Sequence, residues 1–286
     1  MVEKFIPKTK AEALDILSKH DCYILAGGTD LMVAKKNIAG HLPKFEKDVL
    51  YTSQIADLKG IYKEGNCIHV LANSTMDEVE NSPLAPSLLK KAISEVASTN
   101  IRHFATLVGN IANASPAGDT IIVDVILDAT LKLESVNAVR YVKAEDFVLG
   151  VRKIDRKPNE LITEIIFPEV NYDKEMWFKV GSRKADSISK VMVAGIYKIY
   201  GKSLENFALT VGSVSIKPVR SHEIEEELKG MSLEDVKKHK NDIVEEYAKL
   251  IKPIDDQRST AEYRLTVAKN IIAKFIDEIT EGGKYV

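Results

Sequence analysis

Apolar residues recur along the chain in two different periods, and together these periods predict a mixed α+β protein. A capping box at Thr9 and Glu12 predicts a helix whose apolar side chains Ala13, Leu14 and Leu17 face the core. Short runs rich in β-branched residues predict strands. Up to residue 170 we expect strands at 22–26, 49–52, 67–72, 130–134, 138–142 and 160–168, and helices at 29–35, from 75, at 84–97 and at 119–129.

The pattern changes near residue 171. Strands are predicted at 177–181, 191–200 and 207–214, and only helices follow them. In the last helix, apolar residues recur at steps of four and three and form one stripe: Ala261, Leu265, Ala268, Ile272, Phe275 and Ile279. We therefore expect residues 1–172 as a first domain and 173–286 as an α+β domain with a three-stranded sheet and helices against one of its faces.

Two glycine-containing segments are candidates for binding an anionic ligand. In the first, the predicted strand ends at Gly27-Gly28, and a short helix is expected after them. Glycine has no Cβ and tolerates positive φ, so backbone N–H groups can approach a phosphate at a helix N-terminus. A plain tight turn explains Gly-Gly equally well. The segment does not match the GxGxxG pattern of dinucleotide-binding folds.

The second segment, Thr106 to Thr120, gathers hydroxyl, amide and carboxylate groups in a stretch that we expect to be a loop. Pro116 disfavours a helical conformation at Ser115, and Asp119 is placed to begin the helix 119–129. Asp119 is either a ligand contact or an ordinary N-cap behind a polar loop. We expect the two segments to converge in space into one phosphate cradle.

Composition excludes several other classes of function. The net charge of −2 predicts no nucleic-acid binding. Two distant cysteines and six histidines without ligand spacing predict neither an iron–sulfur cluster nor a metal site, and His69 is expected to be partly exposed in a strand. The N-terminus lacks the apolar core of a secretory signal, and Asp124 and Asp128 interrupt the longest apolar region, so we expect a cytoplasmic protein without a membrane span.

Four ordered motifs resemble the FAD-binding medium subunit of the molybdenum hydroxylases, the family that includes xanthine dehydrogenase and carbon monoxide dehydrogenase. They are AGGTDL from Ala26, TLVGNIANASPAGD from Thr106, KVGSRKADSI from Lys179 and DQRSTAEYR from Asp256. Three positions depart from the family pattern. Val108 replaces a frequent glycine, Gly118 a frequent alanine and Ser187 a frequent aspartate.

The resemblance implies a fold and a set of cofactor contacts. It implies an FAD-binding domain of two α/β subdomains, 1–55 and 56–172, of the vanillyl-alcohol-oxidase or PCMH type, followed by the C-terminal domain. The pyrophosphate of FAD would lie in the first loop, and Lys179 would lie at the pyrimidine end of the flavin. The FAD-binding positions that it implies are Ile24, Leu25, Ala26, Gly27, Gly28, Thr29, Asp30, Leu31, Ala97, Thr106, Gly109, Asn110, Asp119, Leu161 and Lys179.

The resemblance also implies partners. Electrons would come from an iron–sulfur small subunit, and substrate oxidation would occur on a molybdenum-pterin large subunit, as in xanthine dehydrogenase. The flavin would pass the electrons to NAD or another acceptor, and this chain would hold no catalytic residue of its own. Three alternatives stay open: a carbon monoxide dehydrogenase-type medium subunit, a free-standing FAD oxidoreductase such as an enolpyruvyl-sugar reductase, and a nucleotide-binding or assembly module without redox function.

Overall fold

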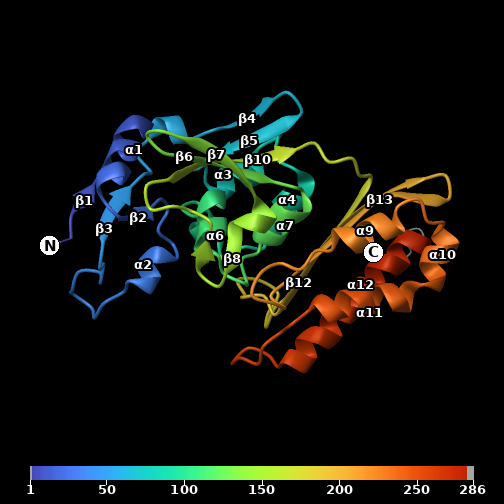
Figure 1. Ribbon diagram of the computed structural model, residues 1–286. Coiled ribbons are helices and arrows are strands. Elements are labelled where there is room, and N and C mark those ends of the chain that lie inside the picture. Colours follow the sequence, from blue (N-terminus) through green and yellow to red (C-terminus); the bar gives the residue numbers. More distant parts are fainter. Residues whose placement is uncertain (1, 282–286) are drawn as a thin grey trace. The chain divides into compact units, whose positions relative to one another are not determined.

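The computed structural model describes residues 2–281, which form two compact units (Figure 1). The first unit runs up to Pro86 and adds Ala97–Ala114 and Ala129–Glu169. The second comprises Ser87–Val96, Ser115–Asp128 and the chain from Val170 onward. Each unit combines sheets and helices, so the predicted α+β class is confirmed.

The first unit begins with a small parallel sheet of order β1-β3-β2, formed by Lys4–Phe5, Asp48–Tyr51 and Cys22–Leu25. Helix α1 (Lys10–Lys19) buries Ala13, Leu14 and Leu17 in the same cluster as Cys22 and Leu50, as the apolar spacing predicts. The capping box is only half formed. The Thr9 hydroxyl accepts from the backbone N–H of Glu12. The Glu12 carboxylate, however, accepts from the backbone N–H of Lys8 and not from that of Thr9.

A five-stranded antiparallel sheet forms the rest of this unit, with the order β4-β5-β10-β6-β7. The strands are Ile61–Glu64, Cys67–Leu71, Leu161–Pro168, Thr130–Glu134 and Val139–Lys143. The smaller elements are α2 (Leu31–Ala34), η1 (Ala56–Leu58), α3 (Met76–Asn81), α5 (Thr99–Arg102), α6 (Leu107–Asn113), α8 (Ala144–Phe147), β8 (Val148–Gly150) and β9 (Lys153–Ile154).

His69 in β5 is buried, contrary to the expectation of a partly exposed strand histidine. Only 9% of its surface is exposed, and its Nδ1 lies 2.7 Å from the Glu164 carboxylate on β10. Tyr62 stacks on its ring from β4. A polar partner on the next strand thus lets a histidine occupy a buried position.

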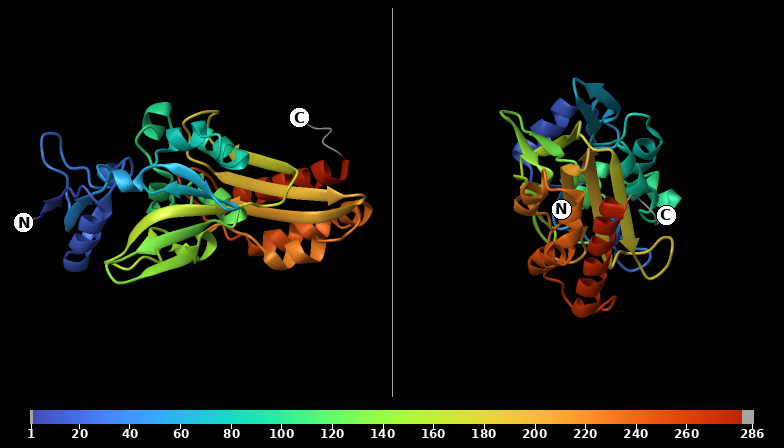
Figure 2. Two further views of the ribbon diagram at one scale, coloured as in Figure 1. Left: turned by 90° about the horizontal axis from the view of Figure 1, so that it is seen from above. Right: turned by 90° about the vertical axis from the view of Figure 1, so that its right-hand side faces the viewer.

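The second unit contains the three-stranded antiparallel sheet that the C-terminal pattern predicts. Its strands are β11 (Lys174–Val180), β12 (Val191–Tyr200) and β13 (Ser203–Gly212), in that order. Helices α9 (His222–Leu228), α10 (Leu233–Lys238), α11 (Lys240–Leu250) and α12 (Ala261–Glu281) share a core with one face of it. Helix α12 packs against β12, and Figure 2 shows it in red beside the sheet.

The C-terminal helices lie against one face, as expected, and the other face of this sheet is covered as well. Helices α4 (Ser87–Ser94) and α7 (Ile121–Ile126), which come from earlier in the chain, pack there. Gly212 faces Ile122 of α7, whereas Gly195 faces Phe275 of α12. The signal was present in the sequence, because the run from Val191 to Tyr197 is apolar without alternation, as is typical of a strand buried on both faces.

Helix α12 is anchored as its pattern predicts. Ala268, Ile272, Phe275 and Ile279 are buried, while Ala261 and Leu265 at its first turns are half-buried. The buried Arg264 guanidinium donates to the carbonyls of Lys190 and Ser213, each at 2.7 Å. The helix is therefore fixed to the sheet by charge-assisted hydrogen bonds as well as by apolar packing.

Candidate functional site

The first glycine segment forms a turn between β2 and α2. Strand β2 ends at Leu25, and α2 begins at Leu31. Gly28 has a φ of +72°, in the left-handed region that glycine adopts most readily. A Cβ at this position would lie 2.8 Å from Cδ1 of Leu25 and 3.1 Å from Cγ of Met32. The turn therefore requires glycine at position 28 for both conformation and space.

Gly27 brings this turn against the second segment of the sequence. A Cβ on Gly27 would lie 1.8 Å from the carbonyl oxygen of Phe104 and 3.1 Å from the backbone nitrogen of Ala105. The backbone of the first turn thus touches the residues that lead directly into Thr106. The two segments, which lie about 80 residues apart in sequence, converge in the first unit.

The turn offers backbone donors that the protein itself does not use. Among the described residues, the N–H groups of Gly28, Thr29, Asp30 and Leu31 have no protein acceptor. Asp30 occupies the N-cap position of α2 but makes no side-chain capping bond. A run of free N–H groups at the start of a helix is an arrangement that binds anions.

The first half of the second segment is a helix, α6, whereas residues 114–120 form the loop that the polar residues suggested. Thr106 is the N-cap of α6, and its hydroxyl accepts from the N–H of Gly109 at 2.9 Å. Helix α6 ends at Ala114, whose φ of 45° is left-handed. Asn110 lies in the first turns of this helix. The capping bond and tertiary packing outweigh the poor helix propensity of Gly109 and Asn110.

Asp119 and Lys179 meet in the second unit. The Lys179 ammonium donates to Oδ2 of Asp119 at 2.9 Å and to the backbone carbonyl of Glu95 at 2.7 Å, and only 4% of its side chain is exposed. Asp119 does not begin a helix, because Thr120 is the N-cap of α7. The N-cap interpretation of Asp119 is therefore wrong.

Burial changes the pKa of Asp119. Removal from water raises the pKa of Asp119 to about 6, and the neighbouring positive charge of Lys179 opposes that rise. The second carboxylate oxygen, Oδ1, is buried and has no hydrogen-bond partner among the described residues. A buried acceptor without a donor is costly, so this oxygen is a good position for a donor on a ligand.

The other residues predicted to contact FAD lie in a turn, in a buried strand and at the end of β2. Ala97 adopts a φ of 44° in the turn that follows α4, and Glu95, two residues before it, supplies the carbonyl that holds Lys179. Leu161, at the start of β10, is buried in the cluster around Cys22 and Leu50. Ile24, Leu25 and Ala26 run from β2 into the turn and are half-buried.

Two family descriptions match consecutive parts of the chain. Residues 1–170 match the FAD-binding domain in molybdopterin dehydrogenase. Residues 176–279 match the C-terminal domain of carbon monoxide dehydrogenase flavoproteins. The chain belongs to this FAD-binding family. Its cofactor is therefore FAD, and its class is that of the oxidoreductases.

Relatives of this family match nearly end to end. The chain is 32% identical to a nicotinate dehydrogenase FAD-subunit of Eubacterium barkeri, with 81% of this chain and 80% of the relative covered. It is 30% identical to a glyceraldehyde dehydrogenase medium chain of Sulfolobus acidocaldarius, with 94% of each covered. A reconstituted carbon monoxide dehydrogenase from Oligotropha carboxidovorans has the same fold, with a TM-score of 0.87 over 98% of each chain at 23% identity.

Sequence reasoning missed two of the groups that shape these sites. The Glu95 carbonyl, which holds Lys179, is a backbone group and leaves no side-chain signal. The contact of Gly27 with the Phe104 backbone is also invisible to a motif. Both depend on tertiary contacts that sequence spacing does not encode.

Proposed function

We propose that this chain is the FAD-binding electron-transfer subunit of a multi-subunit molybdenum hydroxylase. In this proposal it accepts electrons from iron–sulfur clusters on a small subunit and passes them to NAD or another acceptor, while a large subunit with the molybdenum-pterin cofactor oxidises the organic substrate. Residues 1–172 form the FAD-binding domain and 173–286 the C-terminal domain. A cytoplasmic location stays a prediction from the sequence.

The observation that carries the proposal is the contact of Gly27 with the backbone of Phe104 and Ala105. It brings the free N–H groups of residues 28–31 next to the segment that begins at Thr106. In this proposal the N–H groups of the turn bind the diphosphate of FAD. Its charge would be compensated by several charge-assisted hydrogen bonds, each worth about 1.5–3 kcal/mol.

In the second unit, we propose that Asp119 and Lys179 contact the sugar and ring portions of FAD. Oδ1 of Asp119 can accept from a hydroxyl of the ribityl chain, which would remove its burial cost. The Lys179 ammonium would place positive charge near the pyrimidine ring, but Asp119 already balances part of that charge. When bound, FAD supplies the capacity to take up two electrons and to release them one or two at a time.

Thr106, Gly109 and Asn110 complete the proposed site from the first turns of α6, with Leu161 and Ala97 as apolar neighbours. The N–H of Gly109 already donates to the Thr106 hydroxyl, so it is not available to FAD. Gly109 would instead let the cofactor approach the backbone closely, because it has no side chain. A Cβ at Gly109 would crowd that hydroxyl at 2.8 Å.

The relatives favour a subunit over a free-standing flavin oxidoreductase. They are described as an FAD-subunit and a medium chain, and the chain covers 80% and 94% of their lengths. A carbon monoxide dehydrogenase medium chain of Hydrogenophaga pseudoflava is 23% identical to this chain. The proposal therefore includes a complex of the carbon monoxide dehydrogenase type. The organic substrate would be selected by the large subunit.

Purification of the chain alone and together with its co-eluting proteins tests the proposal. We expect a yellow protein with about one FAD per chain, reversible bleaching by dithionite, and co-elution with an iron–sulfur protein and a molybdenum protein. Mass spectrometry identifies the partners, and the absorbance spectrum measures the flavin. A correctly folded, colourless chain that takes up no added FAD would contradict the proposal.

A further inference from the structure

Three potential metal ligands from separate segments converge at the N-terminal sheet of the first unit. Glu3 precedes β1, His20 is the C-cap residue of α1, and Asp48 is the first residue of β3. One ligand atom of each lies within 4.8 Å of the other two. We propose that Glu3, His20 and Asp48 bind one divalent transition-metal ion of the Zn²⁺ class.

The backbone holds the two carboxylate residues side by side. Val49 donates its N–H to the carbonyl of Glu3 at 2.9 Å, within the parallel pairing of β1 and β3. The N–H of Glu3 donates to Oδ1 of Asp48 at 2.8 Å, which fixes the orientation of that carboxylate. An outer hydrogen bond that orients a ligand is a common feature of protein metal sites.

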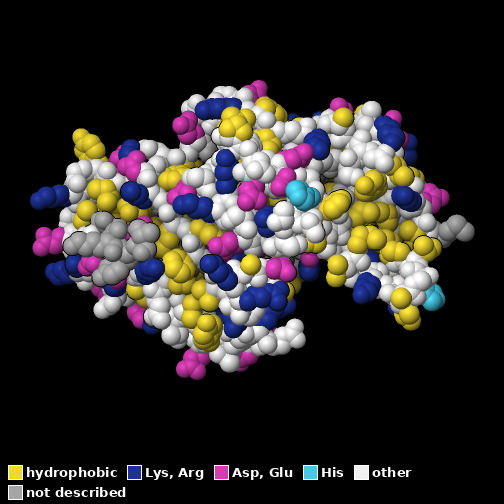
Figure 3. All heavy atoms as spheres, turned by 180° about the vertical axis from the view of Figure 1, so that it is seen from behind, with side chains coloured by type: hydrophobic (Ala, Val, Ile, Leu, Met, Phe, Trp, Pro, Cys, Tyr) yellow, Lys and Arg dark blue, Asp and Glu magenta, His cyan; other side chains and the backbone are white. Residues whose placement is uncertain are grey.

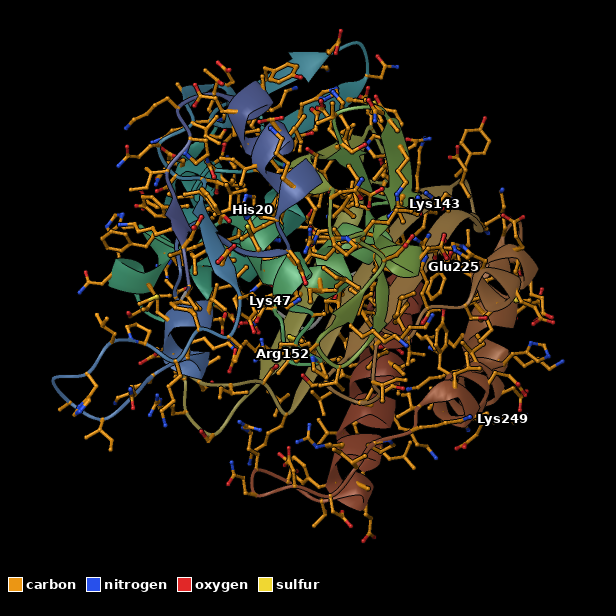
Figure 4. All side chains as sticks on the ribbon, turned by 60° about the vertical axis from the view of Figure 1, so that its left-hand side comes forward. His20, Lys47, Lys143, Arg152, Glu225 and Lys249 are labelled. Atoms are coloured by element: carbon orange, nitrogen blue, oxygen red, sulfur yellow. The ribbon has the colours of Figure 1, made fainter. Side chains whose placement is uncertain are left out.

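The imidazole of His20 is already at chelating distance from Asp48. Its Nδ1 lies 3.1 Å from Oδ2 of Asp48. Two ligands about 2.0–2.1 Å from a tetrahedral Zn²⁺ are roughly 3.3–3.4 Å apart, so little movement is needed. Phe5 packs against the imidazole ring with centroids 4.6 Å apart and limits its rotation. Figure 4 shows His20 beside the blue strands of this sheet.

The third ligand distinguishes this group from an ordinary histidine–aspartate hydrogen bond. The side chain of Glu3 is exposed and can turn toward the pair without disturbing the core. His103 and Asp77 provide the comparison, since their Nδ1 and Oδ2 atoms lie 3.3 Å apart but no second carboxylate completes a described group. That pair is therefore the natural internal control.

The donor set selects the type of ion. One imidazole nitrogen and two carboxylate oxygens suit Zn²⁺, with water as a fourth ligand, whereas Mg²⁺ and Ca²⁺ prefer six or more oxygen ligands.

Such an ion would attach the short strand β1 to α1 and β3. Strand β1 has only two residues, Lys4–Phe5, so its own ladder is weak. The ligands are 17 and 28 residues apart in sequence, which is why no ligand motif is visible. Binding would therefore stabilise the N-terminal part of the first unit, independently of the flavin.

Titration of Zn²⁺ alone into the purified full chain, followed by calorimetry, tests this site. We expect one saturable site whose affinity falls at least tenfold in Glu3→Ala and in His20→Gln, because losing a ligand costs no less than the roughly 10–100-fold cost of losing an outer-shell partner. Glu3→Ala is decisive, since it leaves the bond between the His20 and Asp48 side chains in place. His103→Ala should bind Zn²⁺ like the parent chain.

Circular dichroism of each variant confirms that it is folded before titration, and Co²⁺ absorbance gives a second readout of the coordination. The absence of saturable Zn²⁺ binding by the parent chain would overturn the proposal. So would binding that Glu3→Ala and His20→Gln retain, because the ion would then lie elsewhere, for example at Cys67 or His103.

Discussion

At the scale of single residues, the phosphate cradle depends most on Gly27, which has no room for a side chain. Even one methyl group there would overlap the Phe104 carbonyl and separate the two segments. We expect Gly27→Ala to weaken FAD binding by at least about tenfold, the effect of losing one charge-assisted hydrogen bond. Flavin content after purification and a fluorescence titration with FAD measure it.

Gly150→Ala is the matched control for this substitution. Nothing lies within 4 Å of the position a Cβ would take at Gly150, and its φ is not positive. This variant should bind FAD like the parent chain. Equal flavin content in Gly27→Ala and Gly150→Ala would contradict the assignment of the turn to the pyrophosphate.

Asp124 is the least favourable residue in the second unit and gives a pH-dependent prediction. It is fully buried in α7, neither carboxylate oxygen has a partner among the described residues, and burial raises its pKa well above the ordinary value. As pH rises above about 4, the unfolded chain releases this proton and the folded chain keeps it. The stability contributed by this group therefore decreases as pH rises, by about 1.4 kcal/mol per unit.

Replacement of Asp124 should remove this dependence. We expect Asp124→Leu to raise the free energy of unfolding by about 1–3 kcal/mol from polar burial alone, with a larger gain at higher pH. Asp124→Asn should flatten the pH dependence without recovering the cost of polar burial. Urea unfolding between pH 5 and 8 measures both effects, and a gain from leucine that is the same at every pH would contradict the role of titration.

The sequence contained more information about the residues of the site than about their local structure. Gly27, Gly28 and Thr106 were recognised because small side chains and hydroxyl groups are required where backbones meet a ligand or begin a helix. The pairing of Asp119 with Lys179 was not predicted, because 60 residues separate the two positions and only the fold brings them together. The grouping of Glu3, His20 and Asp48 was missed for the same reason.

At the scale of elements, long apolar strands were predicted well and short polar ones were not. Strand β12 has the predicted bounds, because its continuous apolar run leaves no other interpretation. Strand β4, Ile61–Glu64, was missed because it is mostly exposed and carries charged residues. Helix α6 was missed because glycine and asparagine lie within it, and packing overrides their propensity.

The contact between β12 and α12 gives a prediction at this scale. A Cβ on Gly195 would lie 2.4–2.8 Å from three ring atoms of Phe275, so the helix approaches the sheet closely because this position has no side chain. We expect Gly195→Ala to destabilise the protein by about 1–3 kcal/mol through overpacking. Adding Phe275→Leu should recover part of that loss, since the smaller side chain makes room.

A double-mutant cycle measured by urea unfolding tests this contact. Residues in contact show coupling free energies of about 0.5–3 kcal/mol, whereas independent residues add. Strictly additive effects of the two substitutions would show that the ring does not limit the approach of α12 to β12.

At the scale of the whole molecule, acidic and basic residues nearly balance, with 42 Asp and Glu against 40 Lys and Arg. The face in Figure 3 shows acidic and basic side chains interspersed, in agreement with the net charge of −2. Within residues 2–281, no helix combines the length and the apolar character needed to cross a bilayer.

Binding of FAD should stabilise the folded chain by mass action. At a free concentration 100 times its Kd, a ligand that binds only the folded state adds about 2.7 kcal/mol, which for a chain of 286 residues raises Tm by roughly 4–5 °C. Riboflavin is the matched control ligand, because it has the same ring and ribityl chain but no phosphate. If the free N–H groups of residues 28–31 bind the pyrophosphate, riboflavin should raise Tm far less than FAD at equal concentration. Equal Tm shifts from both ligands would show that the flavin ring and ribityl chain provide the affinity. That result would contradict the assignment of residues 28–31 to the pyrophosphate.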